Sequence, residues 1–234
     1  MSDESSPPNP AAPWLWRRDW SERRIRDQNR SGIWFLLLFS LFWNSIAWGV
    51  TIATWRGAPK RGPEHYLILL FPFLGVLLLV AALLAAIRRI RYGVAVLELA
   101  TLPAPLGRAL AGHVRIGSGL APDREVSLRL RAIHRTVTGA GKNRRVRDEV
   151  VWEAGRTLPG AIPKDGGIVV PVAIPIPSDA PETATLNRND RILWLLDVSS
   201  AVPGVDFEAQ FEVPVFRTAE SATPLTPEEL ARLR

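Results

Sequence analysis

The chain has 234 residues, of which 47% are hydrophobic and 22% charged, and a formal net charge of +6 at pH 7. It contains no cysteine, which excludes disulfide bonds, thiolate metal sites and a cysteine nucleophile. The positive charge is concentrated in residues 1–147, which hold 22 Lys and Arg against 9 Asp and Glu. Residues 148–234 hold 7 against 14, so the chain is basic only in the part that carries its long apolar runs.

The first segment, residues 1–13, is rich in proline and serine and lacks the apolar content that offsets ordering entropy. We expect it to be a disordered tail. Residues 14–32 begin with indoles beside arginines, and tryptophan favours the headgroup region of a membrane because its ring is apolar and its N–H needs a polar partner. The motif consists of Trp14, Trp16, Arg17, Asp19 and Trp20. This pattern predicts an interfacial segment. Docking onto a partner or onto the chain's own soluble domain is the alternative, since Asp19 does not suit an anionic surface.

Two apolar runs follow, Ile33–Thr54 and Tyr66–Ile87, and neither contains a charged residue. A helix needs roughly 20 apolar residues to cross the hydrocarbon core of a bilayer, and each run reaches that length. The short connection between them allows only a tight helical hairpin. Residues 33–90 are therefore predicted to be a transmembrane hairpin of two helices.

Polar and small residues in the two runs predict how the helices meet. One side of the first helix carries polar residues, and the second helix carries a seam of small residues that permits close approach. The predicted contact set is Ser40, Asn44, Thr51, Gly75, Ala82 and Ala86. Because neither run contains an ionisable residue, these positions indicate helix packing rather than ion or proton transport.

The orientation of the hairpin follows from the cations that flank it. Ten arginines flank the hairpin on the sides of the two termini: Arg17, Arg18, Arg23, Arg24, Arg26, Arg30, Arg88, Arg89, Arg91 and Arg108. The connection between the runs carries only Arg56, Lys60 and Arg61. We therefore expect the N- and C-termini to face the cytoplasm.

From residue 91 the hydrophobic period changes to the alternation of half-buried strands. Predicted strands are 94–100, 112–116, 126–132, 145–153, 168–176, 191–199 and 207–216. Seven or eight strands separated by Gly- and Pro-rich turns favour a β-sandwich over residues 91–218. The tail 219–234 is expected to contain a short helix capped by Thr226. The fold class is thus a membrane α-helical hairpin followed by an all-β sandwich domain.

Five sequence motifs resemble those of an uncharacterised family of bacterial membrane proteins: Pro13–Trp20, Pro105–Gly107, Gly139–Arg144, Ile174–Pro177 and Val202–Phe216. The resemblance covers nearly the whole chain after Pro13. It implies a two-helix membrane protein with a C-terminal arrestin-like or immunoglobulin-like sandwich in the bacterial inner membrane. The family has no assigned activity, so the resemblance supports the architecture and adds no chemistry.

Catalytic and metal-binding patterns are weak. His65, His113 and His134 lack the short spacing of a metal pair, and no cysteine completes one. Ser199 and Ser200 lack the flanking glycines of a nucleophile elbow. The segment Gly139–Asn143 fails the spacing of a phosphate loop and is followed by a strand, which favours a hairpin turn with glycine at positive φ. We expect no cofactor and no metal.

A run of cations on one predicted hairpin is the best candidate site. It consists of Arg129, Arg131, Arg135, Lys142, Arg144, Arg145 and Arg147. Like charges on neighbouring strands are destabilising unless something neutralises them. Acidic residues such as Asp148, Glu149, Glu208 and Glu212, anionic lipid headgroups, or an acidic protein are the three alternatives. Nucleic acid is not expected, because the hairpin has no interleaved aromatic residues for stacking bases.

The predicted function is a membrane-anchored, non-enzymatic binding or scaffolding module that faces the cytoplasm. Its partners are the lipid bilayer, anionic headgroups and an unknown protein, with exposed strand edges suited to peptide capture. The alternative is a structural subunit of a larger membrane complex assembled through the hairpin. An enzyme using Asp206 and Glu208 is the least favoured class, because both are expected on the solvent face of a strand.

Overall fold

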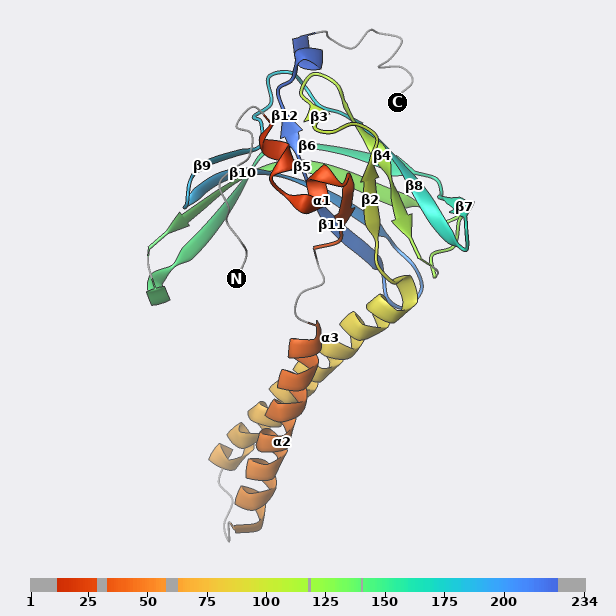
Figure 1. Cartoon of the computed structure of the whole chain (residues 1–234). Helices are drawn as coiled ribbons and strands as arrows, with labels where there is room; N and C mark the ends of the chain where they lie inside the picture. Colours follow the sequence, from red (N-terminus) through yellow and green to blue (C-terminus); the bar gives the residue numbers. More distant parts are fainter. Residues whose placement is uncertain (1–11, 29–32, 58–62, 118, 140, 223–234) are drawn as a thin grey trace. The chain divides into compact units, whose positions relative to one another are not determined.

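The computed structural model describes residues 12–28, 33–57, 63–117, 119–139 and 141–222 (Figure 1). The chain divides into two compact units, a β unit of Met1–Asn29 and Tyr92–Arg234 and a helical unit of Arg30–Arg91. The β unit is therefore assembled from residues on both sides of the helical unit in the sequence. Of the disordered tail expected over residues 1–13, residues 1–11 lie outside the described residues, whereas Pro13 begins the 3-10 turn η1 (Pro13–Leu15) and so belongs to ordered structure. The helix expected after Thr226 also lies outside the described residues.

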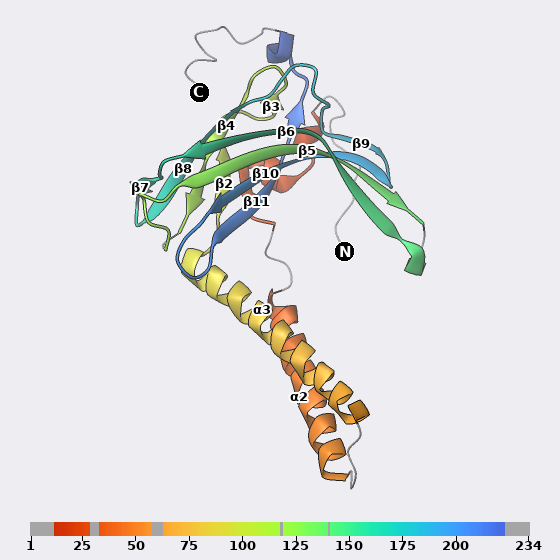
Figure 2. The same ribbon diagram turned by 180° about the vertical axis from the view of Figure 1, so that it is seen from behind.

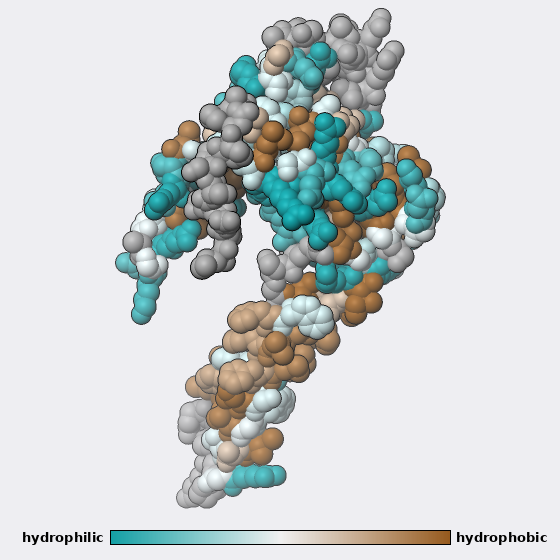
Figure 3. Space-filling model, viewed as in Figure 1, coloured by the Kyte–Doolittle hydropathy of each residue, from teal (hydrophilic) through white to brown (hydrophobic). Residues whose placement is uncertain are grey.

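The helical unit consists of α2 (Ile33–Gly57), a 3-10 turn η2 (Pro63–Leu69) and α3 (Leu70–Tyr92). Two stretches, Ile33–Gly57 and Tyr66–Tyr92, are long and apolar enough to cross a membrane. Most of their apolar side chains are exposed, and on the face shown in Figure 3 the surface of the two helices is mostly hydrophobic. This is the surface expected of helices that are covered by something apolar.

The residues predicted to join the helices lie in their contact. Ser40, Thr51 and Ala82 are buried, and Ala86 is half-buried. The Asn44 side-chain amide donates to the carbonyl oxygen of Gly75 at 2.7 Å, so a polar side chain of one helix is satisfied by the backbone of the other. Asn44 is therefore the polar residue of this set that joins the two helices, and Ser40 and Thr51 are buried in their contact.

Gly75 is the tightest point of this contact. A Cβ at that position would lie 2.8 Å from Asn44 Oδ1 and 3.0 Å from Trp43 Cδ1. We expect Gly75→Ala to destabilise the hairpin by about 1–3 kcal/mol, because the Asn44 and Trp43 side chains that meet the added Cβ must shift and the bond from Asn44 to Gly75 is disturbed. Thermal unfolding of the full chain in detergent, followed by circular dichroism, measures the loss. Gly49→Ala is the matched control, since nothing lies within 4 Å of its added Cβ. Equal stability of the two variants would contradict the packing described.

The β unit contains two principal sheets that lie face to face (Figures 1 and 2). The first sheet consists, in spatial order, of β1 (Arg24–Arg26), β2 (Val96–Leu99), β4 (Ala109–Ile116), β8 (Gly167–Pro175) and β7 (Ile162–Lys164). The second sheet consists, in spatial order, of β11 (Phe207–Val213), β10 (Asp190–Ser200), β5 (Val126–Thr138) and β6 (Arg145–Leu158). β9 (Ala184–Asn187) also pairs with β10, and β3 (Ala104–Pro105) pairs with β12 (Val215–Phe216).

One hydrophobic core fills the space between the sheets. The first sheet contributes Leu97 and Val114, and the second contributes Leu130, Trp194 and Phe211, all at most 1% exposed. The alternation of buried and exposed residues along each strand produces these inner faces, because successive side chains point to opposite sides of a sheet. The all-β sandwich expected from the sequence is present, and each predicted strand has a counterpart.

The N-terminal segment is where the structure corrects the predicted domain boundaries. Residues 14–32 were expected to form a separate interfacial segment and the sandwich to begin at residue 91. Instead β1 pairs antiparallel with β2, with Ile25 opposite Leu97 and fully buried. The short helix α1 (Arg18–Ser21) places Trp20 in the core cluster, with 5% exposure. The described part of this segment, residues 14–28, therefore docks onto the chain's own β unit, which was the alternative left open by the sequence, and it buries the apolar side chains of Ile25 and Trp20 there.

Candidate functional site

The basic run lies on the hairpin formed by β5 and β6, the longest strands of the β unit. The half of this hairpin that contains the turn extends beyond the rest of the β unit (Figures 1 and 2). Thr138 and Arg145 are the last paired residues before the turn. Gly139 and Gly141 in that turn have φ of 79° and 57°, a conformation that favours glycine. The segment is a hairpin turn, as the sequence predicted, and not a phosphate loop.

Three cations of the run are neutralised by acidic side chains of the same unit. Arg131 contacts Asp197 at 2.6 Å, and Arg135 contacts Asp148 with two nitrogens at 2.7 Å. Arg129 lies farther from Glu153, at 3.6 Å. Of the acidic partners proposed from the sequence, Asp148 is used, whereas Asp197 and Glu153 were missed because pairing across strands depends on register.

The pair of Arg135 and Asp148 makes the half of the hairpin that contains the turn sensitive to acid. Hydrogen bonding to Arg135 holds the pKa of Asp148 below its ordinary value. Because this pKa is lower in the folded chain, the pair stabilises the hairpin above the ordinary Asp pKa, and the contribution is lost as the pH falls through the lowered value. The gain is small, since the Asp148 side chain is 40% exposed. An NMR titration of this carboxyl should show a depressed midpoint that returns to the ordinary value in Arg135→Gln, and equal midpoints would contradict the pairing.

The other four cations, Lys142, Arg144, Arg145 and Arg147, form a group that we call the basic tip. All four are exposed, and within the described ranges no ion pair joins them to an acidic side chain. The apolar residues Val146, Val150 and Val151 beside them are also exposed, at 56%, 48% and 45%. The predicted patch therefore consists of two parts: three arginines that pair with acidic side chains, and the basic tip.

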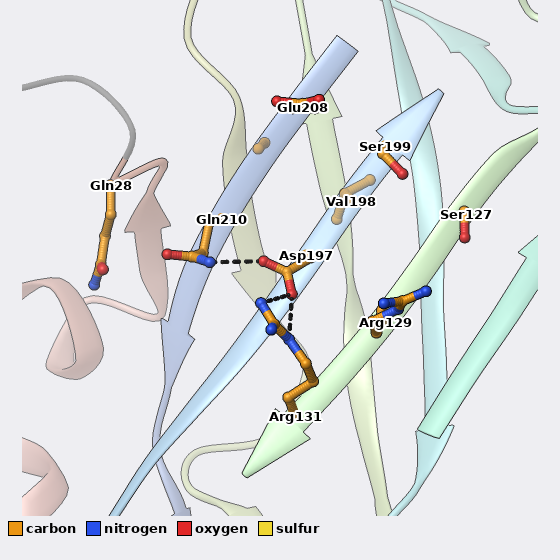
Figure 4. Close-up of a pocket in the computed structure, with 10 residues that line it drawn as sticks. Gln28, Ser127, Arg129, Arg131, Asp197, Val198, Ser199, Glu208 and Gln210 are labelled. Atoms are coloured by element: carbon orange, nitrogen blue, oxygen red, sulfur yellow. Dashed lines mark hydrogen bonds and ion pairs between the residues drawn. The ribbon is translucent and has the colours of Figure 1, made fainter. Parts of the chain in front are cut away.

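A groove of about 620 Å³ crosses the outer face of β5, β10 and β11 (Figure 4). At its centre Asp197 accepts from Arg131 and from the Gln210 side-chain amide, the latter at 2.7 Å. Ser127 and Ser199 line one end. The central polar groups of this groove therefore bond to one another.

The tryptophan motif forms an aromatic cluster at the edge of a second hollow, of about 600 Å³. The rings of Trp14 and Trp20 lie 5.3 Å and 6.5 Å from that of Phe216. Arg17 lies 4.2 Å from the centroid of the Trp20 ring and contacts Glu212 at 2.6 Å. Asp19 holds the same guanidinium at 2.8 Å, which explains an acidic residue in this motif. Trp16 remains exposed.

Three of the side chains considered for catalysis or metal binding make structural contacts, and the His65 side chain lies outside the part that the structure describes. His113 pairs with Glu98 at 2.8 Å and His134 with Asp190 at 2.6 Å. The Ser200 hydroxyl donates to the carbonyl oxygen of Glu125 at 2.7 Å. Within the residues that the structure describes, no group of three or more His, Asp or Glu side chains is placed to hold a metal ion.

The chain matches no protein-family model and no curated protein. Among solved structures it is similar to Spo0M, a sporulation control protein from Bacillus subtilis, with 14% identity and a TM-score of 0.35. The alignment covers 53% of this chain, which spans about half of that structure (49%). A similarity at this TM-score does not establish a shared fold, and the β unit is defined by its own strand order and core.

Proposed function

We propose that this protein is a membrane-anchored, non-enzymatic β-sandwich that works as a binding or scaffolding module on the cytoplasmic side of the bacterial inner membrane. The observation that carries the proposal is the pairing of β1 with β2, in which Arg26 lies opposite Val96. β1 precedes the helical unit in the sequence and β2 follows it. The chain therefore leaves and re-enters the same sheet, which requires an even number of membrane crossings, and two helices of spanning length supply it.

The surface of the helical unit supports the anchor. Trp34, Leu67 and Ile90 are 75%, 71% and 83% exposed, and many apolar neighbours on both helices are about half exposed. An apolar surface of this extent is stable only when lipid or protein covers it. The excess of arginine outside the two spans supports a cytoplasmic β unit. An arrestin-like sandwich remains part of this proposal through the sequence resemblance.

The basic tip is the proposed ligand-binding surface, and anionic lipid headgroups are its proposed ligand. Cations near an anionic membrane each contribute about 1 kcal/mol of attraction. The tip carries four cations without an acidic partner among the described residues and places exposed valines beside them.

The proposal is tested with the full chain in vesicles. The chain has no cysteine, so Asn143→Cys accepts a single environment-sensitive dye at the tip. We expect stronger, blue-shifted emission in phosphatidylcholine vesicles containing phosphatidylglycerol than in phosphatidylcholine alone, and loss of this difference at high salt. Lys142→Gln with Arg144→Gln should remove most of it, whereas Arg124→Gln with Lys164→Gln, which neutralises two exposed cations elsewhere, should not. Identical emission in both lipids would contradict binding to headgroups.

The alternative function, a subunit assembled through the hairpin, has less support. It needs polar residues of the spans to be free for another protein. Asn44 donates to Gly75, and the hydroxyls of Ser40 and Thr51 donate to carbonyl oxygens of their own helix at 2.8 and 2.7 Å. The polar side of the first span is therefore used within the hairpin.

A further inference from the structure

β6 presents a long strand edge, and the other described edges of the β unit are short, contain proline or are partly covered. β9, the edge strand beside β10, has only four residues. β7 and β1 have three residues each, and the part of β8 beyond β7 contains Pro171 and Pro175, which have no N–H to donate. The edge of β11 is covered where the Gln28 N–H donates to the carbonyl oxygen of Gln210. β6 has 14 residues and no proline, and every residue from 145 to 151 is exposed. It is therefore the edge of the described strands that remains open to pairing.

The direction of the backbone groups on this edge follows from one hydrogen bond. The Val137 N–H donates to the carbonyl oxygen of Asn189, so Val137 points its backbone groups towards β10. Val146 lies opposite Val137 on β6, and its N–H and C=O therefore point away from β5. By the alternation of a strand, Asp148 and Val150 also point theirs outward. Among the described residues nothing bonds to the outward backbone donors and acceptors of these three residues, which follow one another at regular spacing.

We propose that this edge pairs antiparallel with the same edge of a second copy of the chain, about a two-fold axis at Asp148. In this register Val146 lies opposite the partner's Val150, and Val150 opposite the partner's Val146. The outward-pointing residues of one copy meet those of the other, as a closed two-fold interface requires. The two sheets then continue into one another.

The side chains match in this register on one face of the sheet. Within one copy, Ile133 lies opposite Val150, and Val137 lies opposite Val146. Pairing through β6 extends each into a row of four apolar side chains, which runs from Ile133 through Val150 to the partner's Val146 and the partner's Val137. Cross-strand pairs of β-branched residues are favourable, and the exposed valines would be covered. This gives the apolar residues beside the basic tip a role.

The charges on the opposite face select the same register. Arg147 lies opposite the partner's Glu149, and Glu149 opposite the partner's Arg147, which gives two attractive pairs. A slide of two residues, the smallest that keeps the hydrogen-bond pattern, places either Arg147 opposite the partner's Arg147 or Glu149 opposite the partner's Glu149. At the axis, the two Asp148 carboxylates are each already bound by their own Arg135.

The interface is small, and this sets the conditions of the test. A seam of a few residues is below the area of a stable dimer in dilute solution. Two copies held in one bilayer meet at a high effective concentration, so a weak contact is sufficient there. This step rests on the proposed membrane anchor, and the experiment therefore uses the full chain in vesicles.

Cross-linking between single-cysteine variants tests the register. Val146→Cys and Val150→Cys are substitutions at exposed positions, in a chain that has no other cysteine. Opposed Cα atoms in such a pair lie about 5.5 Å apart, whereas identical residues are offset by four positions along the strands. With a short thiol cross-linker, we expect a mixture of the two variants to form dimers about tenfold faster than either variant alone. Equal rates overturn the register. If neither the mixture nor either variant alone forms dimers, the proposal is overturned, and an extended segment of another protein would be the alternative partner of this edge.

Exchange of the charges separates pairing from misfolding. With Arg147→Glu in both copies, the cross-link should form about tenfold more slowly, because both pairs become repulsive. Arg147→Glu in the Val146→Cys copy and Glu149→Arg in the Val150→Cys copy should restore the rate. Failure of this restoration overturns the proposal. Resistance of the protein to alkaline extraction from the vesicles is measured in parallel, so that loss of the anchor is distinguished from loss of pairing.

Discussion

Trp20→Ala should destabilise the β unit by about 3–5 kcal/mol. The indole is 5% exposed, its N–H donates to the Glu212 carbonyl oxygen at 3.0 Å, and Arg17 covers its face. Removing the ring leaves a cavity against Phe216 and takes away the contact that places Arg17. Denaturant unfolding of the full chain in detergent, followed by near-ultraviolet circular dichroism, measures the change.

The control is Trp16→Ala, four residues earlier in the same motif. Trp16 is 47% exposed, so its loss should cost much less stability. If the motif instead served only as a membrane-interface anchor, both substitutions would leave the unfolding of the β unit unchanged and weaken membrane association equally. The contrast between the two variants therefore distinguishes docking onto the β unit from an interfacial role.

Gly112→Ala should also disrupt the β unit strongly, by about 3 kcal/mol. Gly112 lies in β4 opposite Leu99 of β2, and a Cβ there would sit against the carbonyl oxygen of Glu98, closer than real Cβ contacts allow. Because the Glu98 carbonyl oxygen is a backbone atom, β2 must move away from β4. This movement also affects β1, which joins the first sheet through β2. The same unfolding measurement detects the loss.

Gly155→Ala is the matched control for this strand substitution. Gly155 lies in β6, and its added Cβ would meet the nearest atom, the Leu128 carbonyl oxygen, at 3.5 Å, an ordinary contact. We expect little change or a slight gain, since alanine restricts the unfolded chain. A similar loss in both variants would show that the close approach of β2 and β4 is not what makes Gly112 necessary.

Strong periodic patterns made much of this architecture predictable. The apolar runs mark α2 and α3, and alternation marks the principal strands, because burial on one face imposes a period of two. β1 was missed, since three residues with one buried side chain, Ile25, carry no readable period. β7 and β9 are similarly short. The join between residues before and after the hairpin is a tertiary contact that local sequence does not encode.

The candidate site was predicted in composition but not in detail. The sequence identified all seven cations of the run, yet it could not tell Arg131, held by Asp197, from Arg147, which lies on an open edge. That distinction depends on which strand lies beside β5 and on a bulge between Ala132 and Ile133 that shifts the register of β6. The contact of Asn44 with Gly75 could be predicted from the sequence, because it depends only on helical spacing and on small residues in the facing helix.

The most direct test of the account is labelling of two single cysteines with a membrane-impermeant maleimide in right-side-out spheroplasts and in inverted vesicles. Asn143→Cys reports the β unit, and Gly57→Cys, at the end of α2 with open space around its added Cβ, reports the turn between the spans. With a cytoplasmic β unit and two membrane crossings, we expect Asn143→Cys to react only in inverted vesicles and Gly57→Cys only in spheroplasts. Reaction of both cysteines in the same preparation would contradict the membrane hairpin, and the reverse pattern would contradict a cytoplasmic β unit.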